Sequence, residues 1–283
     1  MIPNLLIGLR EGLEASLVVS VLVAYLVKSG RRNQLPLVWL GTGAAAVISL
    51  GFGAALTFGP SGLTFEVQEA IGGALSIMAV GLVTWMVFWM AKASRSLASH
   101  LRSQVDSTDA KPWSLVLIAA LAVGREGLET ALFLWAATRS AVQEGSSTTE
   151  PLVGALIGLL IAVALGYAIY AGAIRINLTK FFTITGGALI AIAAGVLAYG
   201  VHDLQEADIL PGEHMLAYDV SATIPPSSLV GTLFKGILNI SPSATVLEVV
   251  VWVAYVLVVG LLFARAVQRG SRASTPSPQL VAS

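Results

Sequence analysis

The chain has 283 residues, of which 56% are hydrophobic and only 11% are charged. A soluble domain carries about 25% charged residues, so this composition argues strongly against a soluble globular protein, and the high hydrophobicity excludes intrinsic disorder. Sixteen basic and sixteen acidic residues balance, which gives no reason to expect a nucleic-acid partner. The absence of cysteine removes disulfides, iron–sulfur clusters and thiolate metal sites. The class that remains is a multi-pass membrane protein.

Seven apolar runs, each long enough to cross a bilayer, follow one another along the chain. Unbroken runs of this length predict helices, because the strands of a membrane barrel would show about 10 residues of alternating polarity. The first run has no basic residue before it and holds charges within it, which argues against a cleaved signal peptide. The predicted helices are residues 3–28, 35–59, 66–91, 113–138, 151–172, 181–204 and 245–267.

The basic residues between these helices set the expected orientation, since Lys and Arg are enriched on the cytoplasmic side of a membrane. Twelve of them fall on one side, and only Arg139 and Lys235 fall on the other. This bias predicts an external N-terminus and a cytoplasmic C-terminus in the cytoplasmic membrane. The twelve are Lys28, Arg31, Arg32, Lys92, Arg95, Arg102, Lys111, Arg175, Lys180, Arg265, Arg269 and Arg272.

The external side is acidic and carries the one long connection, residues 206–244. An acidic outer face suits an arriving cation, although selection against external bases explains the same pattern. Pro225 and Pro226 argue against a continuous helix in the long connection. Residues 269–283, rich in Ser and Pro, are expected to form a disordered cytoplasmic tail, which leaves residues 1–268 as a single transmembrane domain.

One charged motif occurs twice inside the apolar runs, at residues 10–14 and again at 125–129, and both copies read Arg-Glu-Gly-Leu-Glu. Such an identity, 115 positions apart, predicts an internal repeat in which the first three helices correspond to the next three. The first and fourth helices are expected to cross the membrane in opposite directions. The two halves are therefore predicted to be inverted repeats, which in many transporters enclose a substrate site near the midplane.

The spacing within each motif carries chemistry. On a helix the two glutamates, at i and i+3, share a face, and the arginine can pair with the second glutamate at i+4. Each charge would cost about 2.5–3.5 kcal/mol at the bilayer centre, so the six side chains should face one another around a polar cavity. Four carboxylates and two guanidinium groups leave a net charge of −2, which a cation would balance. An alternative is that the Arg–Glu pairs only hold helices together, but the second glutamate of each motif is then surplus.

Carboxylates are hard oxygen ligands, which suit magnesium, calcium, manganese and ferric iron. Copper and zinc are disfavoured, because the chain has no cysteine, no methionine cluster and only three scattered histidines. Further acidic residues lie at the outer ends of the predicted helices, where they either capture an arriving cation or are ordinary interfacial carboxylates. The candidate capture residues are Glu66, Glu69, His202, Asp203, Glu206 and Glu248.

The doubled Arg-Glu-x-x-Glu motif, on the first and fourth of seven helices, resembles the oxidase-dependent iron transporter family. This family comprises the fungal high-affinity iron permeases and the bacterial EfeU permeases. Phe65-Glu66-Val67-Gln68-Glu69, the stretch His202-Asp203-Leu204-Gln205-Glu206 and the long external connection are similar to the bacterial branch. The resemblance therefore covers about residues 3–267.

The resemblance implies high-affinity import of iron as the transported substrate, with no permanently bound cofactor. Its iron ligands would be Glu11, Glu14, Glu126 and Glu129, oriented by Arg10 and Arg125. The partners expected are the iron ion, the lipid bilayer and an extracytoplasmic protein that oxidises iron, either a haem peroxidase or a cupredoxin-like protein. A homo-oligomer is a further expectation.

Two other functions fit the same residues, namely transport of another hard divalent cation such as manganese, and a non-transporting scaffold or sensor subunit. An enzyme is not expected, since the metalloprotease motif H-E-x-x-H is absent. A retinal-binding receptor is disfavoured because residues 245–264 contain no lysine for a Schiff base.

Overall fold

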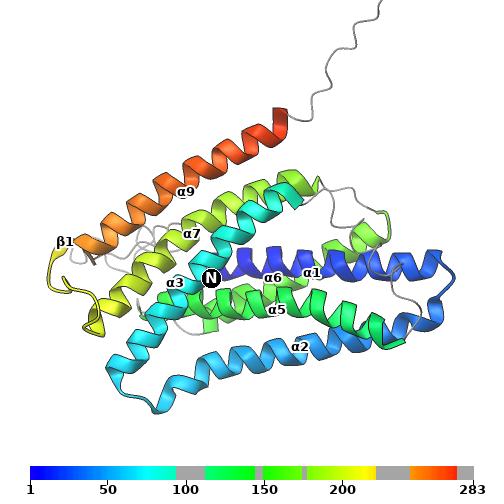
Figure 1. Cartoon of the computed structure of the whole chain (residues 1–283), viewed down its shortest axis with the longest axis horizontal. Helices are drawn as coiled ribbons and strands as arrows, with labels where there is room; N and C mark the ends of the chain where they lie inside the picture. Colours follow the sequence, from blue (N-terminus) through cyan, green and yellow to red (C-terminus); the bar gives the residue numbers. More distant parts are fainter. Residues whose placement is uncertain (94–111, 144–148, 174–176, 221–242, 273–283) are drawn as a thin grey trace, which may run out of the picture.

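The computed structural model describes residues 1–93, 112–143, 149–173, 177–220 and 243–272 (Figure 1). Within these ranges the chain forms seven long helices, two single 3₁₀ turns and two short strands. The helices are α1 (Ile2–Lys28), α2 (Leu35–Phe58), α3 (Phe65–Ala93), α5 (Pro112–Gln143), α6 (Thr149–Tyr170), α7 (Leu178–Glu206) and α9 (Val246–Arg272). The turns are η1 (Arg32–Gln34) and η2 (Gly59–Gly62), and the strands are β1 (Leu216–Asp219) and β2 (Ser243–Thr245).

The helix boundaries lie close to the seven predicted apolar runs, and the differences have local causes. Helix α5 continues to Gln143, five residues beyond the predicted end, because residues 139–143 contain no proline or glycine to stop it. Helix α9 continues to Arg272, so the tail predicted from residue 269 begins as helix, and residues 273–283 lie outside the described part. Helix α7 begins at Asn177, whose side chain accepts a hydrogen bond from the backbone nitrogen of Lys180 at 3.0 Å.

The connection between α7 and α9 contains a structure that the sequence interpretation did not include. Strands β1 and β2 pair antiparallel, with Leu216 opposite Thr245 and Asp219 opposite Ser243, and the register is irregular between them. Within the described residues the regular structure is helical apart from this short two-stranded sheet, which is consistent with the expected all-α membrane protein. Residues 221–242, between the strands, lie outside the described part of the chain.

The outer surface of the bundle is apolar in the way that a lipid-facing surface must be. Helices α2, α3, α6, α7 and α9 are long and apolar enough to cross a membrane. Helices α2, α6 and α9 also expose leucine and valine along their length, including Leu50, Leu160 and Leu261. Helices α1 and α5 differ from these five because they carry the two charged motifs. The chain is thus a multi-pass membrane protein in which the two charged motifs lie inside the bundle.

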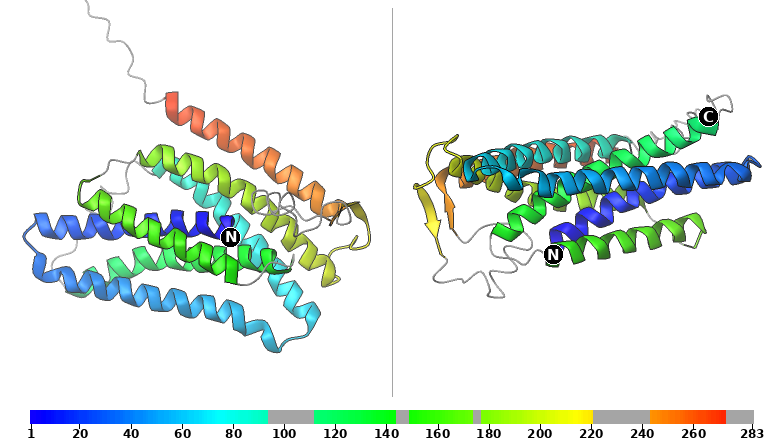
Figure 2. Two further views of the ribbon diagram at one scale, coloured as in Figure 1. Left: turned by 180° about the vertical axis from the view of Figure 1, so that it is seen from behind. Right: turned by 90° about the horizontal axis from the view of Figure 1, so that it is seen from below.

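Two of the helix pairs are equivalent under an exchange of the two halves of the chain. The closest pairings are α1 with α6, α2 with α5, and α3 with α7. Exchanging α1, α2 and α3 for α5, α6 and α7 converts the first pair into the second and leaves the third unchanged. Figure 2 shows the bundle from behind and from below, with α2 and α6 on opposite sides of α1 and α5.

The directions of the helices follow the same exchange. Helices α1 and α6 run parallel, since Gly154 lies against Met1 and Gly166 lies against Ser16. Helices α2 and α5 are also parallel, whereas α3 and α7 are antiparallel, as are α1 and α5. Consecutive helices therefore alternate in direction, as the sequence interpretation requires of successive membrane crossings.

Small residues allow the charged helices to approach their parallel partners closely. A Cβ atom on Gly8 of α1 would lie 2.6 Å from the carbonyl oxygen of Ala155 in α6, and one on Gly158 would collide with that of Leu5. In the other half Gly41 lies against Val116, and the motif residue Gly127 lies against Ser49. Close backbone packing of this kind is how membrane helices associate without a hydrophobic driving force.

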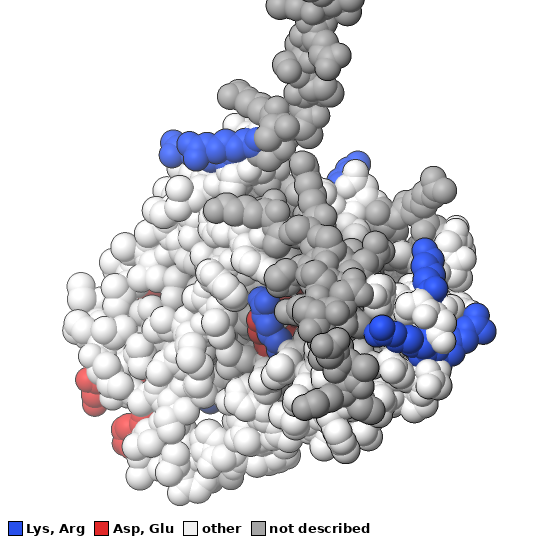
Figure 3. All heavy atoms as spheres, turned by 45° about the vertical axis from the view of Figure 1, so that its right-hand side comes forward, with Lys and Arg blue, Asp and Glu red and all other residues white. Residues whose placement is uncertain are grey.

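Charge is distributed unevenly over the surface. In Figure 3 most basic side chains lie toward the upper and right-hand parts of the view, and acidic ones lie at the left-hand edge. This separation agrees with the division of basic and acidic residues seen in the sequence.

Replacing Gly158 by alanine tests the close α1–α6 contact. We expect Gly158→Ala to destabilise the detergent-solubilised protein by about 1–3 kcal/mol, the usual cost of overpacking. Gly51→Ala is the matched control, because Gly51 lies in α2 with nothing within 4 Å of its would-be Cβ. Size-exclusion chromatography after graded heating measures both variants, and equal melting of the two would contradict the close contact.

Candidate metal-binding site

The two charged motifs meet because α1 and α5 cross antiparallel in the middle of the bundle. One hydrogen bond fixes their register near one end, where the side-chain nitrogen of Asn4 donates to the hydroxyl of Thr138 at 2.7 Å. Seven residues further along α1 lies Glu11, and nine residues back along α5 from Thr138 lies Glu129. The motif carboxylates of both helices therefore fall at the same level of the bundle.

Each motif makes the same internal ion pair. In α1 the Nε atom of Arg10 lies 3.2 Å from Glu14 Oε1, and in α5 the Nε atom of Arg125 lies 2.9 Å from Glu129 Oε1. Both pairs are spaced i, i+4, as the sequence interpretation expected. The arginine of each half thus holds the second glutamate of its own motif and leaves the first glutamate without that partner.

Three of the four motif glutamates converge. Glu11, Glu126 and Glu129 each offer a carboxylate oxygen, and these atoms lie within 4.8 Å of one another. Four buried oxygens, both of Glu11 and Oε2 of Glu126 and Glu129, have no hydrogen-bond donor among the described residues. Buried carboxylate oxygens normally accept hydrogen bonds. The unpaired oxygens of this group are therefore free to act as the hard oxygen ligands that a cation requires. Glu14 lies outside the triad and is held by Arg10.

The two arginines have different surroundings although their motifs are identical. Arg10 is fully buried, with its guanidinium carbon 6.0 Å from the ring centre of Phe182. The side chain of Arg125 is 37% exposed and lies over Trp89 and Trp85, at 4.8 and 5.4 Å from their ring centres. The two tryptophan rings stack on each other at 6.3 Å. Trp85 and Trp89 thus hold the more exposed arginine by cation–π contact.

A second acidic group lies further along α5, and it brings together α3, α5 and α7. Arg139 donates from Nη2 to Glu69 at 2.7 Å and from Nε to Asp203 at 3.0 Å. Oxygens of Glu69, Asp203 and Glu206 lie within 4.8 Å of one another. We call these four residues the outer cluster. Three of its members are predicted capture residues, and the fourth, Arg139, neutralises part of their charge.

The remaining capture candidates lie around the outer cluster in different settings. His202 contacts Glu248 at 3.1 Å and Glu206 at 3.4 Å. Glu248 also accepts a hydrogen bond from the backbone nitrogen of Thr245, and the Thr245 hydroxyl accepts one from the Glu248 nitrogen. This reciprocal pair is a capping box that starts α9, so Glu248 has a structural task. Glu66 is exposed and stands apart from the cluster.

Sequence reasoning did not identify Arg139, Trp85 and Trp89 as parts of these sites. Arg139 had one available signal, since it is one of only two basic residues on the acidic side of the chain. Trp85 and Trp89 are spaced i, i+4 within an apolar helix, which places them on one face, but nothing in the spacing identifies Arg125 as their partner.

The fold and the site together define a class. The molecule is an integral membrane protein that encloses, within an apolar bundle, a group of unpaired carboxylate oxygens suited to a hard cation. Comparison with known proteins narrows this class: the model of the Iron permease FTR1 family matches residues 1–270, and the chain belongs to that family.

Individual relatives carry related names. The chain is 37% identical to the "Ferrous iron permease EfeU" of Shigella sonnei (strain Ss046) over 278 residues, which cover 97% of this chain and 99% of the relative. It is 35% identical to the protein of that name from Yersinia pestis, over 93% of each chain. A protein of Escherichia coli (strain K12), named "Putative inactive ferrous iron permease EfeU", is 37% identical over 97% of this chain and 99% of its own length. No solved structure matches the chain.

The unequal burial of the two arginines yields a stability prediction. We expect Arg10→Met to lower the stability of the iron-free protein by on the order of 3 kcal/mol, because breaking a fully buried pair strands its carboxylate. Arg125→Met should cost clearly less, since that side chain is partly exposed and Glu129 is nearer the surface. Thermal unfolding of the two variants in detergent makes the comparison, and an equal loss would mean that burial does not distinguish the motifs.

Proposed function

We propose that this chain imports iron across the cytoplasmic membrane and that the triad Glu11, Glu126 and Glu129 binds the iron in transit. The single observation that carries the proposal is the convergence of three carboxylates from two helices, with four buried oxygens lacking donors in the described part of the chain. Membership of an iron permease family supports iron as the cation.

Charge supports the same assignment. The two motifs contribute four carboxylates and two guanidinium groups, so the site carries −2 when all are ionised. An uncompensated charge in an apolar interior is strongly unfavourable, and a bound iron ion would offset it. Arg10 and Arg125 each neutralise one glutamate, which limits the excess negative charge and keeps the release of iron feasible.

We also propose seven membrane spans arranged as an inverted repeat of three helices each, followed by α9. The alternating helix directions and the equivalence of the α1–α6 and α2–α5 pairs support this arrangement. The excess of Lys and Arg on one side supports an external N-terminus and a cytoplasmic C-terminus. In this orientation the outer cluster lies between the external solution and the triad.

The route proposed for iron follows from this order. Iron reaches the acidic external side, where Glu69, Asp203 and Glu206 capture it, and then moves to the triad. Glu66, His202 and Glu248 stay predicted capture residues, with Glu248 already engaged by the capping box. The relatives are named ferrous iron permeases, so we propose ferrous iron as the form supplied outside.

Coupling to oxidation is the final part of the proposal. We propose that an extracytoplasmic partner, a haem peroxidase or a cupredoxin-like protein, oxidises the iron before it enters. The support is the preference of carboxylate oxygens for hard ions such as ferric iron, together with the family resemblance seen in the sequence. No resident cofactor is proposed, and a homo-oligomer stays a prediction.

Uptake of radioactive iron into proteoliposomes tests the central proposal. We expect Glu126→Gln and Glu129→Gln each to reduce initial uptake about tenfold or more, since loss of one charged ligand costs at least 1.4 kcal/mol of binding. Glu150→Gln is the matched control, because Glu150 is an exposed acidic residue at the start of α6. Ferrous and ferric iron are supplied separately, with and without the oxidising partner.

The outcomes separate the alternatives. Normal iron uptake by both triad variants would contradict the proposed site and would mean that these glutamates serve only to hold the helices together. Loss of about half of the saturated iron uptake when manganese is added at equal concentration would favour the alternative of a general hard-cation transporter. Absence of uptake by the wild-type protein even with the partner present would favour the scaffold or sensor subunit.

A further inference from the structure

The two acidic groups are separated by a layer that contains no charge. On α5, Glu129 of the triad and Arg139 of the outer cluster are ten residues apart, which is about 15 Å along a helix. The side chains of α5 that face the bundle interior between them are Leu132, Phe133, Ala136 and Ala137, and none is more than 4% exposed. Iron that passes from one group to the other must therefore cross an apolar region.

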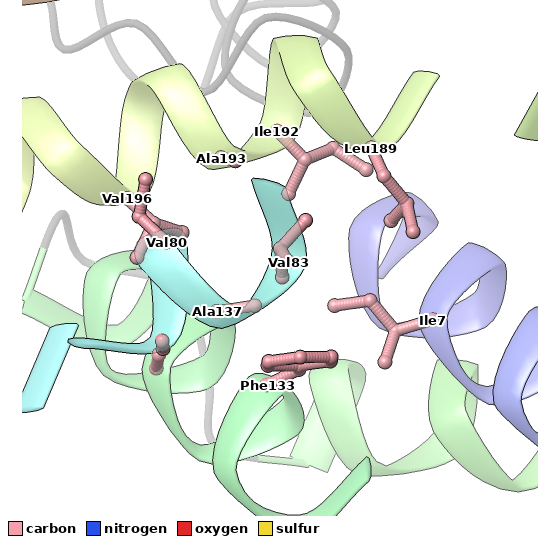
Figure 4. A pocket seen from close by; sticks show the side chains of 11 residues that line it. Ile7, Val80, Val83, Phe133, Ala137, Leu189, Ile192, Ala193 and Val196 are labelled. Carbon is pink, nitrogen blue, oxygen red and sulfur yellow. The ribbon is translucent and has the colours of Figure 1, made fainter. Parts of the chain in front are cut away.

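Four helices contribute to this layer, and their side chains line a small cavity (Figure 4). Eleven side chains line it, all of them apolar and none more than 8% exposed. Figure 4 shows Ile7 of α1, Val83 of α3, Phe133 and Ala137 of α5 and Ile192 of α7 around one hollow. On α5 the lining residues Phe133 and Ala137 come between Glu129 and Arg139, so the hollow lies between the triad and the outer cluster.

The cavity has a volume of about 20 Å³, which is room for one water molecule. Its lining offers no polar partner, and a buried water needs two to four of them, so the cavity stays dry. A cation would lose its hydration there and gain no ligand in return. Dry constrictions of this kind close ion pathways in channels.

The two motifs differ in access. Arg10 is fully buried, whereas the side chain of Arg125 is 37% exposed. The glutamates follow the same order, with Glu14 at 5% and Glu129 at 12% exposure. The site is therefore closer to the surface at the motif of α5 than at the motif of α1.

We propose that the apolar layer around Ile7, Val83, Phe133, Ala137 and Ile192 is the outer gate of the transport pathway and that this structure has the gate closed. The inference rests on the proposed function for its direction of transport. The gate opens when α1, α3, α5 and α7 separate at the cavity, where the packing is already incomplete. The triad then exchanges iron with the outer cluster only in the open state.

Cysteine labelling tests the gate independently of transport, because the chain contains no native cysteine. The reporter is Ala137→Cys, whose sulfur the cavity can accept, and the reagent is a membrane-impermeant maleimide added to the external side of intact cells. Val67→Cys, at an exposed position near the start of α3, is the reference for a freely reactive external site. We expect the reporter to react at least about tenfold more slowly than the reference, because the thiol lies in a dry, closed layer.

Hydration of the layer should open it. Val83→Thr keeps the shape of the side chain and adds a hydroxyl to the cavity wall, so we expect reporter labelling to rise about tenfold. Val87→Thr is the matched control, since Val87 is one turn further along α3 and is also buried but does not line the cavity. The expression level and thermal stability of both threonine variants are compared with those of the protein that carries Ala137→Cys alone.

Fast labelling of Ala137→Cys without any second substitution would overturn the gate, and so would equal effects of Val83→Thr and Val87→Thr. The labelling result holds whether or not wild-type proteoliposomes take up iron, so a failed gate and a failed transport function are distinguishable. Labelling of Val67→Cys only from the opposite side of the membrane would overturn the assignment of the gate to the outside.

Discussion

The need to pair charge inside an apolar bundle governs this structure. Six charged side chains in two short motifs cannot face lipid, so the two helices that carry them, α1 and α5, must lie in the interior and face each other. The more apolar helices α2 and α6 then cover the central pair, and each packs in parallel against one charged helix. The motif itself assists this packing, because Gly127 at its centre leaves room for Ser49 of the covering helix. Charge and close packing are thus specified by the same five residues.

Pairing within each motif leaves one glutamate without an arginine partner. Each arginine pairs with the second glutamate of its own motif, and the first glutamates, Glu11 and Glu126, are left without that partner. Structural ion pairs alone would need one acid for each base, so the additional carboxylates have no stabilising purpose and carry a cost in an apolar interior. Their convergence with Glu129 is explained most simply if a cation completes the site. The outer cluster is held differently, since one arginine, Arg139, bonds two of its three acids, and the cluster also carries a net charge of −2 when all are ionised.

Local periodicity made the helices and the shared faces of each motif predictable, and the repeat made it predictable that α1 and α5 would be equivalent. Contacts between residues far apart in the sequence were harder to predict. The i, i+3 spacing places Glu66 and Glu69 on neighbouring positions of one helix, but only packing buries Glu69 against Arg139, 70 positions away, and leaves Glu66 exposed. The capping box of Thr245 and Glu248 has a sequence signature that was open to recognition, whereas the β1–β2 pairing joins four and three residues across a long connection and has none. The pair Trp85 and Trp89 could be assigned to one face but not to Arg125.

The difference between Arg10 and Arg125 connects the repeat to transport. Two identical motifs in equivalent helices should have equal surroundings if the halves adopted one conformation, yet one arginine is fully buried and the other is partly exposed. The five motif residues are the same, so the difference comes from their neighbours: Phe182 of α7 lies beside Arg10, whereas Trp85 and Trp89 of α3 lie beside Arg125. In an inverted repeat, exchanging the conformations of the two halves exchanges the closed and the accessible sides of the site. Under the proposed inverted repeat, opening the apolar layer toward the outer cluster would therefore accompany closure of the opposite side of the site.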